Sequence, residues 1–562
     1  MASPPLPEVF RFRRFTALLR PGSIPAAGGR FNGGGALATE EKAPQVGRLR
    51  RDVSIWGSFM WGYADVGADI FTALGLVAFA AQGGTPVAFL AAGLVYVLVG
   101  LCYTELASTY PAAGGGQYFT LRGLGDAWGF IAGAALMLDY TIDIALFAVS
   151  AAGYLNYFLG PDTAAFVARL GPFYVNYLWL MESILLILSL VFFNYLGIRV
   201  SSRINEYLGV LAIAGQAVVV VVGFALAWRY GLFHQQLATQ FPSPGKFMYG
   251  SSLAIISFVG LESISQVAQE TRRPSTVIPR SAVALVLNVL LFALAFSVLG
   301  NGLVPWQALG GHQGDPVAFL ARHIPLIGAA AGPAIALLAA SIVYISANSG
   351  VMSVSRLSYS MSRQQLLPRS LSRLHPRFAT PYRTILLFSG LATVMTMAAF
   401  LSPSPHAATS SGAMDILANM YAFGASLGYL LVFIALMVLR FRDPAAPRPF
   451  RMPWNIPVPF RGRRIPFPVL GILGFLGVGM ILFEVILTHA IGRVAGPAWI
   501  LLLLVFYLYY RRSRKLPLWG SAPRDWVASQ RQLLEDSEEY ELLEEYEEAL
   551  QVEGGADHGH SG

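Results

Sequence analysis

The chain alternates between long apolar segments and short polar ones along most of its length. Twelve apolar segments approach the roughly 20 residues that an α-helix needs to cross the hydrocarbon core of a bilayer. The predicted spans are 53–80, 85–110, 127–159, 174–197, 207–228, 247–267, 282–303, 327–359, 385–401, 414–439, 467–487 and 495–510. This pattern predicts an all-α integral membrane protein with twelve transmembrane helices.

Composition supports this class, because 55% of the residues are hydrophobic and only 12% are charged. The single cysteine, Cys102, excludes an internal disulfide and a metal-thiolate site. The histidines fall in loops or tails, apart from His489 at the end of a span. We therefore predict no metal centre, no cofactor and no catalytic residues.

The basic residues predict the orientation of the chain. If the N-terminus is cytoplasmic, all but five of the 39 Lys and Arg residues fall on the cytoplasmic side, where basic loops are retained. The five exceptions are Arg169, Arg229, Lys246, Arg322 and Arg493. We expect a multi-pass protein of the cell membrane with both termini cytoplasmic. The net charge of +8 then reflects topology, and the dispersed basic residues do not predict nucleic-acid binding.

Two tails flank the apolar part. Residues 1–52 carry basic residues but no apolar signal-peptide core, which predicts a flexible cytoplasmic tail. Residues 512–562 end in an acidic stretch, and the leucines at 533, 534, 542, 543 and 550 could line one face of an amphipathic helix. We favour a solvated tail that folds back on basic loops such as 461–464, and the alternative is a partner-docking or regulatory helix.

Acidic residues interrupt several spans although no lysine lies within any of them. These acids are Asp65, Asp69, Asp139, Asp143, Glu262 and Glu484. A buried carboxylate without a basic partner must be protonated, hydrated or bound to a cation. Because Asp139 and Asp143 are four residues apart, they share one helix face. The pattern predicts an interior that accepts positive charge. The alternative, a neutral acid that hydrogen-bonds a neighbouring helix, is the favoured interpretation of Glu484.

The first and sixth spans are both interrupted near their centres. Residues 62–71 place two glycines and two acids in the first span, and residues 257–265 place Gly260 and Glu262 in the sixth. Interruptions at corresponding positions of two five-helix halves are typical of transporters with inverted repeats. We predict a ten-helix core over 53–440 with repeats at about 53–230 and 247–440. A loop and two further helices follow over 441–511. Close helix packing is the alternative explanation of each glycine.

Four motifs resemble those of the amino acid/polyamine/organocation superfamily of transporters. Residues 103–125 are similar to the loop after the second helix of that superfamily, and 268–281 to the loop after its sixth. Residues 356–383 resemble its loop after the eighth helix, and 67–71 its first-helix break. The resemblance implies a five-plus-five inverted repeat like that of LeuT, with discontinuous helices 1 and 6, that moves a small solute by alternating access.

The resemblance also assigns residues to the substrate. It places the substrate carboxylate at Gly67, Ala68 and Asp69, and the amino group at Phe258, Val259 and Gly260. Asp69 departs from the family pattern, which has glycine there, and an ionised Asp69 would repel a carboxylate. Other residues resemble KUP-type potassium transporters, in which the residues matching Asp65, Asp139 and Tyr140 take part in cation binding.

The sequence thus predicts a permease for an amino acid or related cationic amine, and a KUP-like, proton-coupled potassium transporter is the alternative. We favour coupling to protons, with Asp139, Asp143 and Asp69 as candidate carriers. The basic residue that some relatives carry in the fifth helix has no counterpart in 207–228, where Gln216 is the most polar residue. Sodium coupling is the less favoured alternative, with ligands from Ser341, Ser346, Asn348 and Ser349.

Two other classes are less favoured. A transport-derived sensor would bind its ligand without moving it. An enzyme is not expected, because the Gly-x-Gly-Asp motif of intramembrane aspartyl proteases is replaced by Val-Gly-Ala-Asp at 66–69.

Overall fold

Apolar helices make up most of the fold. The computed structural model describes residues 53–159, 166–197, 202–378, 380–404, 412–460, 463–518 and 520–558, so the predicted tail at 1–52 lies outside the described residues. In this part of the chain, eleven helical segments are long and apolar enough to cross a membrane. The first of them, Ile55–Thr109, covers nearly all of the first two predicted spans together. The count of twelve spans stays a prediction.

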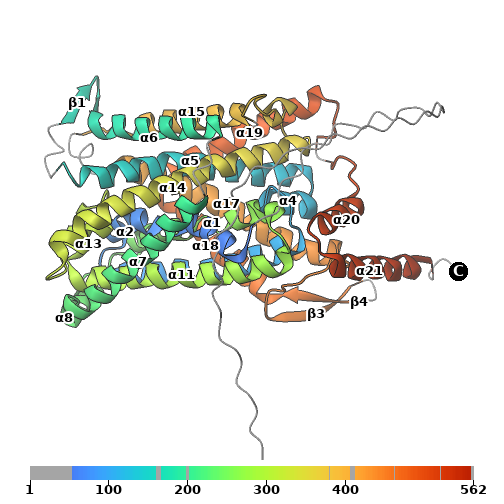
Figure 1. Ribbon diagram of the computed structural model, residues 1–562, viewed down its shortest axis with the longest axis horizontal. Helices are drawn as coiled ribbons and strands as arrows, with labels where there is room; N and C mark the ends of the chain where they lie inside the picture. Colours follow the sequence, from blue (N-terminus) through green and yellow to red (C-terminus); the bar gives the residue numbers. More distant parts are fainter. Residues whose placement is uncertain are drawn as a thin grey trace, which may run out of the picture. The chain divides into compact units, whose positions relative to one another are not determined.

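The first and sixth predicted spans are each divided. The first consists of α1 (Ile55–Val66) and α2 (Asp69–Ala81), which are separated at Gly67 and Ala68. The sixth consists of α9 (Pro244–Ala254), the 3-10 turn η3 (Ile255–Phe258) and α10 (Glu262–Gln266). Both interruptions fall within the stretches that the sequence indicated. Figure 1 shows α1 and α2, in blue, in the middle of the bundle.

Helix α5 (Asp126–Asn156) lies at the core of the protein. Its most apolar 18-residue window is 94% buried, which fits a helix that is apolar on every side. It packs against α14 (Gly328–Arg363) and α17 (Gly412–Arg442). Glycines allow these close contacts, because a Cβ atom at Gly424 would lie 3.0 Å from the backbone nitrogen of Asp139. Packing of α5 therefore places Asp139 and Asp143 in the interior.

Other apolar helices lie at the periphery and expose large aliphatic side chains. In the most apolar 18-residue stretch of each helix, only 22% is buried in α6 and only 17% in α19. Exposed apolar surface of this extent fits contact with lipid. These peripheral helices are α6 (Tyr177–Leu196), α7 (Ser202–Leu226), α11 (Pro274–Leu303), α15 (Tyr382–Ala399), α18 (Val469–Thr488) and α19 (Gly492–Ser513). Helix α3 (Thr85–Thr109) packs along α11.

Short elements connect the long helices. The connecting helices are α4 (Gly116–Leu124), α8 (Tyr230–Thr239), α12 (Trp306–Gly311) and α13 (Pro316–Arg322), with 3-10 turns η1 (Gln82–Gly84), η4 (Ala268–Glu270) and η5 (Arg369–Ser372).

Two antiparallel hairpins, which the sequence analysis did not predict, add to the helices. They pair β1 (Val167–Leu170) with β2 (Phe173–Asn176), and β3 (Asn455–Phe460) with β4 (Arg463–Pro468). The second hairpin is rich in proline, which a two-stranded sheet tolerates because each strand is an edge.

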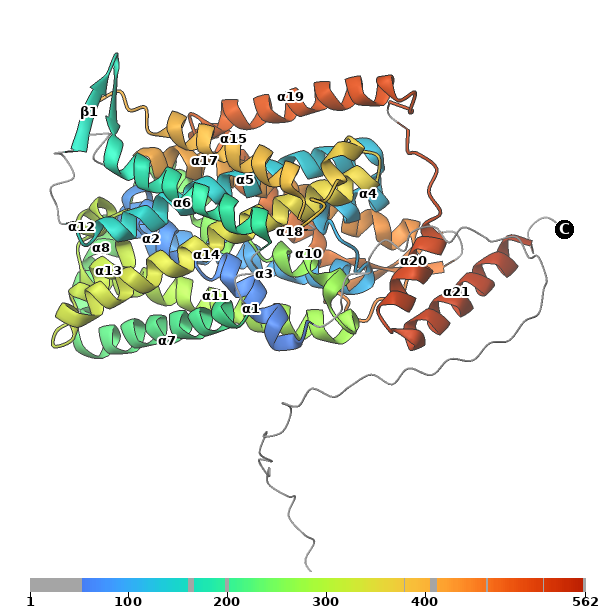
Figure 2. The same ribbon diagram turned by 45° about the horizontal axis from the view of Figure 1, so that its top comes forward.

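The acidic C-terminal stretch forms two helices rather than one. Helix α20 (Trp526–Asp536) and helix α21 (Tyr540–His558) are separated at Glu538, where φ is +58°. The side chains of Leu534 and Tyr546 are buried between them, together with Ala445 from the segment after α17. Both figures place α20 and α21 at the same end of the helical bundle (Figures 1 and 2).

Candidate functional site

The break between α1 and α2 is a kink rather than an unwound segment. Gly67 and Ala68 keep right-handed backbone angles, with φ of −70° and −81°. The Gly67 N–H still donates to the Tyr63 carbonyl at 2.9 Å. The carbonyl of Gly67 accepts a hydrogen bond from Gln216 Nε2 at 3.3 Å. Gln216 on α7, the most polar residue of the fifth predicted span, thus lies at this break.

The break before α10 is sharper. Val259 is extended, and Gly260 has a φ of +113°, a conformation that strongly favours glycine. The Gly260 N–H donates to Glu262 Oε2 at 3.1 Å, and Tyr429 on α17 donates its hydroxyl to the same oxygen at 2.5 Å. The turn therefore presents Glu262 to α17.

The two breaks touch each other. A Cβ atom at Gly260 would lie 3.0 Å from Asp65 Cγ and 3.0 Å from the Val66 backbone nitrogen. Asp65 is also held by α14, because Ser349 Oγ donates to its carboxylate and Ser346 Oγ donates to its carbonyl at 3.1 Å. The fold thus brings together Asp65 and Gly260, two of the residues that the sequence assigned to one site.

Helix α5 adds two acids and a tyrosine to this region. Asp143 Oδ1 accepts a hydrogen bond from Tyr421 on α17 at 3.3 Å. The Tyr140 hydroxyl accepts one from Gln266 Nε2 at 3.2 Å, which connects α5 to α10. The spacing of four residues places Asp139 one helical turn before Asp143, as predicted.

Five buried acids therefore occupy the centre of the bundle, and we call them the five central acids: Asp65, Asp69, Asp139, Asp143 and Glu262. Each is at most 3% exposed. Asp65 lies against Gly260, two residues before Glu262, and Asp143 lies against Gly350 on α14. In the part of the chain that the structure describes, no salt bridge joins any of them to a basic side chain.

Several polar atoms of this cluster have no hydrogen-bond partner among the described residues. They include both carboxylate oxygens of Asp69, both of Asp139, and Glu262 Oε1. The hydroxyl groups of Tyr96 and Tyr103 are buried and unpartnered in the same way. Most buried polar groups in folded proteins are hydrogen-bonded, so a cluster of exceptions indicates a functional site.

Aromatic side chains pack around the second break. The ring of Phe258 lies 5.1 Å from the Tyr96 ring and 6.4 Å from the Phe89 ring, measured between centroids. Phe258 and Val259 are almost fully buried. The positions that the family resemblance assigned to the substrate amino group thus combine an apolar wall with the backbone of Gly260.

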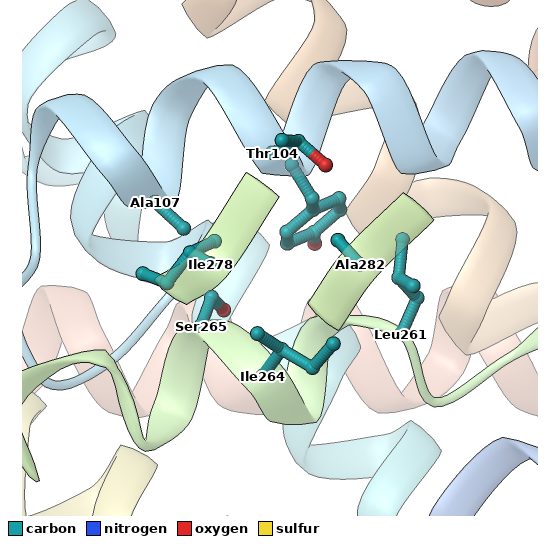
Figure 3. A pocket seen from close by; sticks show the side chains of 8 residues that line it. Thr104, Ala107, Leu261, Ile264, Ser265, Ile278 and Ala282 are labelled. Atoms are coloured by element: carbon teal, nitrogen blue, oxygen red, sulfur yellow. The ribbon is translucent and has the colours of Figure 1, made fainter. Parts of the chain in front are cut away.

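A small cavity of about 10 Å³ lies beside the second break, between α3, α10 and α11. This volume is close to that needed to hold one water molecule. Figure 3 shows the side chains that point toward it, which come from Tyr103, Thr104, Ala107, Leu261, Ile264, Ser265, Ile278 and Ala282. It adjoins the α10 side of the site.

Sequence reasoning identified most but not all of these residues. The sequence indicates Glu262 as an intramembrane acid but does not predict it as a binding residue, although it follows Gly260 by only two residues. Tyr421 and Tyr429 carried no sequence signal, because their role depends on how α17 packs. Glu484 lies on α18 and takes part in none of the contacts above.

The loops that carry the family resemblance form ion pairs at one end of the bundle. Glu105 is fully buried and binds Arg440 through two hydrogen bonds of 2.6 Å. Arg122 binds Asp443 at 2.6 Å. A third pair joins Glu270 to Arg356 at 2.8 Å. These motif residues hold the helix ends together and lie outside the cluster of central acids.

Comparison with known proteins gives a consistent match. A model of the amino acid permease family matches residues 54–509. The branched-chain amino acid permease BcaP of Bacillus subtilis is 28% identical over 83% of this chain and 95% of its own length. Cationic amino acid transporter 4 of Mus musculus is 26% identical over 72% of this chain, which spans only 62% of that relative. The methylthioribose transporter of Bacillus subtilis is 25% identical over 70% of this chain and 82% of its own length.

Proposed function

Because this chain belongs to the amino acid permease family, a family of membrane transporters, we propose that it moves an amino acid or a related cationic amine across the cell membrane by alternating access. The observation that carries the proposal is the cluster of five central acids with no basic partner among the described residues. Buried carboxylates of this kind are stabilised by a bound cation or by protons. A cationic group of the cargo fits this requirement.

We assign the ends of the cargo as follows. The amino group lies near Gly260, Asp65 and Glu262, where the two helix breaks meet and negative charge is concentrated. The carboxylate of an amino acid lies toward Gly67 and Ala68, at the start of α2, where the positive end of the helix dipole favours an anion. Asp69 opposes a carboxylate there unless it is protonated, so it favours cargo whose positive charge exceeds that of a simple zwitterion.

The relatives differ in the cargo that their names give, since one is named for branched-chain and another for cationic amino acids. Five clustered acids favour the cationic class for this chain. A cationic amine with two positive charges would offset more of their mutual repulsion than a zwitterion would.

Movement of the cargo requires two states of the site, and the divided helices supply the hinge between these states. We propose that the repeats at about 53–230 and 247–440 are related by inverted symmetry, with the breaks at Gly67 and Gly260 at corresponding positions. The contact of Gly260 with Asp65 then joins the two repeats at their breaks.

Protons are the proposed coupling ion, and Asp139, Asp143 and Asp69 are the proposed carriers. Asp139 and Asp69 have unpartnered oxygens in the described structure, so a proton on either disrupts no existing ion pair. Sodium is the alternative, and it is supported by the hydroxyl groups of Ser346 and Ser349 around Asp65.

A second candidate cargo is a monovalent cation such as potassium. The observation that favours it is the set of buried, unpartnered carboxylate oxygens on Asp69 and Asp139 among the described residues. Oxygen atoms without competing donors can replace the hydration shell of such an ion.

One experiment separates these candidates. Purified protein in proteoliposomes is given an inward proton gradient, and uptake of a labelled amino acid and polyamine panel is compared with uptake of rubidium. Saturable accumulation of an amine supports the permease proposal, whereas rubidium uptake alone supports the second candidate. Binding without any uptake would indicate a sensor instead. Replacing the proton gradient with a sodium gradient identifies the coupling ion.

A further inference from the structure

The C-terminal hairpin, defined as residues 520–552, is attached to the end of the α5–α14 helix pair. The backbone N–H of Ala522 donates to Asp126 Oδ2 at 3.0 Å, and the Arg524 guanidinium pairs with Asp126 at the first residue of α5. A second Arg524 nitrogen donates to the Gln364 carbonyl at 2.7 Å, directly after α14. Arg511 also binds Asp126, at 2.6 Å. The contact with Asp126 is buried and consists of charge-assisted hydrogen bonds, which are stronger than neutral ones.

The same hairpin also contacts the end of the α3–α11 helix pair. Gln530 is fully buried and donates from Nε2 to the carbonyl of Thr109, the last residue of α3, at 2.9 Å. Glu539 Oε1 accepts the backbone N–H of Ser275, in the first turn of α11, at 3.0 Å. Both contacts satisfy backbone groups that a helix end leaves unpaired, and a carboxylate is favoured at a helix N-terminus.

Between these attachments the hairpin lies over α4 and the segment after α17. The Trp526 ring packs edge-on against Tyr118 at 6.0 Å, and the Arg122 guanidinium lies 5.4 Å from the same ring. Leu534 and Tyr546 bury Ala445. The hairpin is therefore docked along its length and is not a free acidic tail.

The divided helices contact both helix pairs. Helix α5 packs along α14, and α3 packs along α11, whereas α1 contacts both α11 and α14. Helix α10 likewise contacts α14 and α3. Any opening of the site at this end must move the divided helices or one pair relative to the other, and the hairpin bridges both pairs.

We propose that the C-terminal hairpin is an intramolecular clamp that holds this end of the transporter closed and must release α3 and α11 before the site opens there. The inference rests on the alternating access proposed above. Release occurs at α11 because the attachment is weaker there. The Arg272–Glu538 ion pair, at 3.0 Å, is largely exposed, and such pairs contribute little. By contrast, Arg524 of the hairpin pairs with the buried Asp126, and Arg511 of α19 binds both Asp126 and the Gly520 carbonyl.

The test measures how often the site opens at this end, without any need to know the cargo. Ser265 lines the small cavity next to α10 and is 1% exposed, so a Ser265→Cys reporter in a Cys102→Ala background reacts only when this end opens. A membrane-impermeant maleimide is added to the side that carries the C-terminus. Glu539→Ala should raise the labelling rate about two- to ten-fold, the shift expected on loss of one hydrogen bond.

Two control variants refine the result. Glu539→Gln keeps an acceptor for the Ser275 N–H and should label more slowly than Glu539→Ala. Glu541→Ala removes an exposed acid from the first turn of α21, two residues after Glu539, and should match the parent protein. Gln530→Ala, which removes the contact with α3, should raise the rate as well. If neither Glu539→Ala nor Gln530→Ala labels faster while both elute as folded protein, the clamp is refuted.

A second experiment locks the hairpin in place. Arg272→Cys and Glu538→Cys are combined and joined by a reducible bis-maleimide linker. The linked protein should lose uptake in proteoliposomes and regain it on reduction, whereas each single cysteine variant treated alike should not change. Normal uptake by the linked protein would overturn the proposal. If the parent accumulates none of the tested solutes, the proposed function fails, and the labelling rates still decide whether the clamp exists.

Discussion

At the scale of single residues, Asp139 is predicted to be essential for uptake. It is fully buried on α5, and neither carboxylate oxygen has a hydrogen-bond partner among the described residues. We expect Asp139→Asn to lower uptake roughly 30-fold or more, equivalent to about 2 kcal/mol, because a buried charge contact with the cation or proton is removed. Uptake into proteoliposomes measures this effect. The melting temperature should stay the same or rise, since a buried charge is lost.

The matched control for this variant is Glu484→Gln, which neutralises a buried acid on α18 outside the site. It should retain uptake. Normal uptake by Asp139→Asn would remove this residue from the site, and equal losses in both variants would point to a general effect on folding.

Asp69 should determine selectivity. It stands at the first residue of α2, where the family pattern has glycine. We expect Asp69→Gly to shift preference toward neutral amino acids, because the acid no longer repels a substrate carboxylate at the positive end of the helix. Competition of neutral and cationic amino acids for uptake measures the shift. Asp69→Asn, which keeps the size of the side chain, should produce a smaller shift in the same direction. Unchanged selectivity in both variants would mean that Asp69 faces away from the cargo.

The residues that sequence could predict share a simple physical basis. The side chains of Asp139 and Asp143 had to share a helix face because they are four residues apart. The pairing of Glu262 with Tyr429 could not be predicted, because it depends on how α17 packs against the second break. The attachment of Gln216 to the Gly67 carbonyl depends on α7 in the same way.

At the scale of elements, the contact between the two breaks depends on a glycine. Gly260 has a φ of +113°, and a methyl group there would lie 3.0 Å from Asp65 Cγ. We expect Gly260→Ala to destabilise the protein by roughly 1–3 kcal/mol through backbone strain and to lower uptake by separating the breaks. Melting in detergent and uptake in proteoliposomes measure the two effects.

The control for this change is Gly390→Ala on α15. A methyl group at Gly390 meets no atom within 4 Å, so the variant should melt at the same or a higher temperature. If Gly260→Ala has the same melting temperature and uptake as Gly390→Ala, the close contact between the two breaks is not needed for stability or transport.

The turn between α18 and α19 should make stability depend on pH. His489 Nε2 lies 2.7 Å from Ser252 Oγ, and burial lowers the pKa of His489 to about 4 from its ordinary 6.5. The unfolded chain takes up a proton on this residue below about pH 6.5, whereas the folded chain stays neutral until about pH 4. His489 therefore contributes fully to the free energy of unfolding above pH 6.5. This contribution decreases by up to about 3 kcal/mol as the pH falls toward 4.

Melting temperatures of the parent and of His489→Gln across this pH range test the expectation. The parent should lose more stability than the variant on acidification, because glutamine does not titrate. Parallel curves for the two proteins would show that the pKa of His489 is the same in the folded and unfolded chains, and that burial does not lower it. Tyr249 packs against the ring at 4.7 Å and binds Asp415, so these groups belong to the same environment.

The helices that the sequence predicts well are those marked by a long apolar segment. The interruptions at 62–71 and 257–265 were indicated by glycines and acids within otherwise apolar spans. The hairpins β1–β2 and β3–β4 were not predicted, because short strands between helices leave no long periodic pattern. The division of the acidic stretch at Glu538 depends on its docking against the helix ends, which composition alone does not indicate.

At the scale of the whole molecule, charge is distributed unevenly between the two ends of the bundle. The α20–α21 hairpin lies at one end of the bundle and α8 lies at the other (Figures 1 and 2). Arg122 contacts the hairpin at Trp526, and Arg511 and Arg524 bind Asp126 beside it, so basic side chains gather at the hairpin end. Basic residues are retained on the cytoplasmic side. The end that carries the C-terminal hairpin should therefore face the cytoplasm, so that the proposed clamp acts on the inner opening of the site.

Thiol labelling of intact cells tests this orientation directly, because the single native cysteine, Cys102, is buried. Gly231→Cys places a thiol on exposed α8, where a side chain meets no atom within 4 Å, and Glu544→Cys places one on exposed α21. A membrane-impermeant maleimide added outside should label Gly231→Cys only, and permeabilised cells should label both. Labelling of Glu544→Cys in intact cells would show that the C-terminal hairpin faces the outside. The proposed clamp would then control the outer opening of the site.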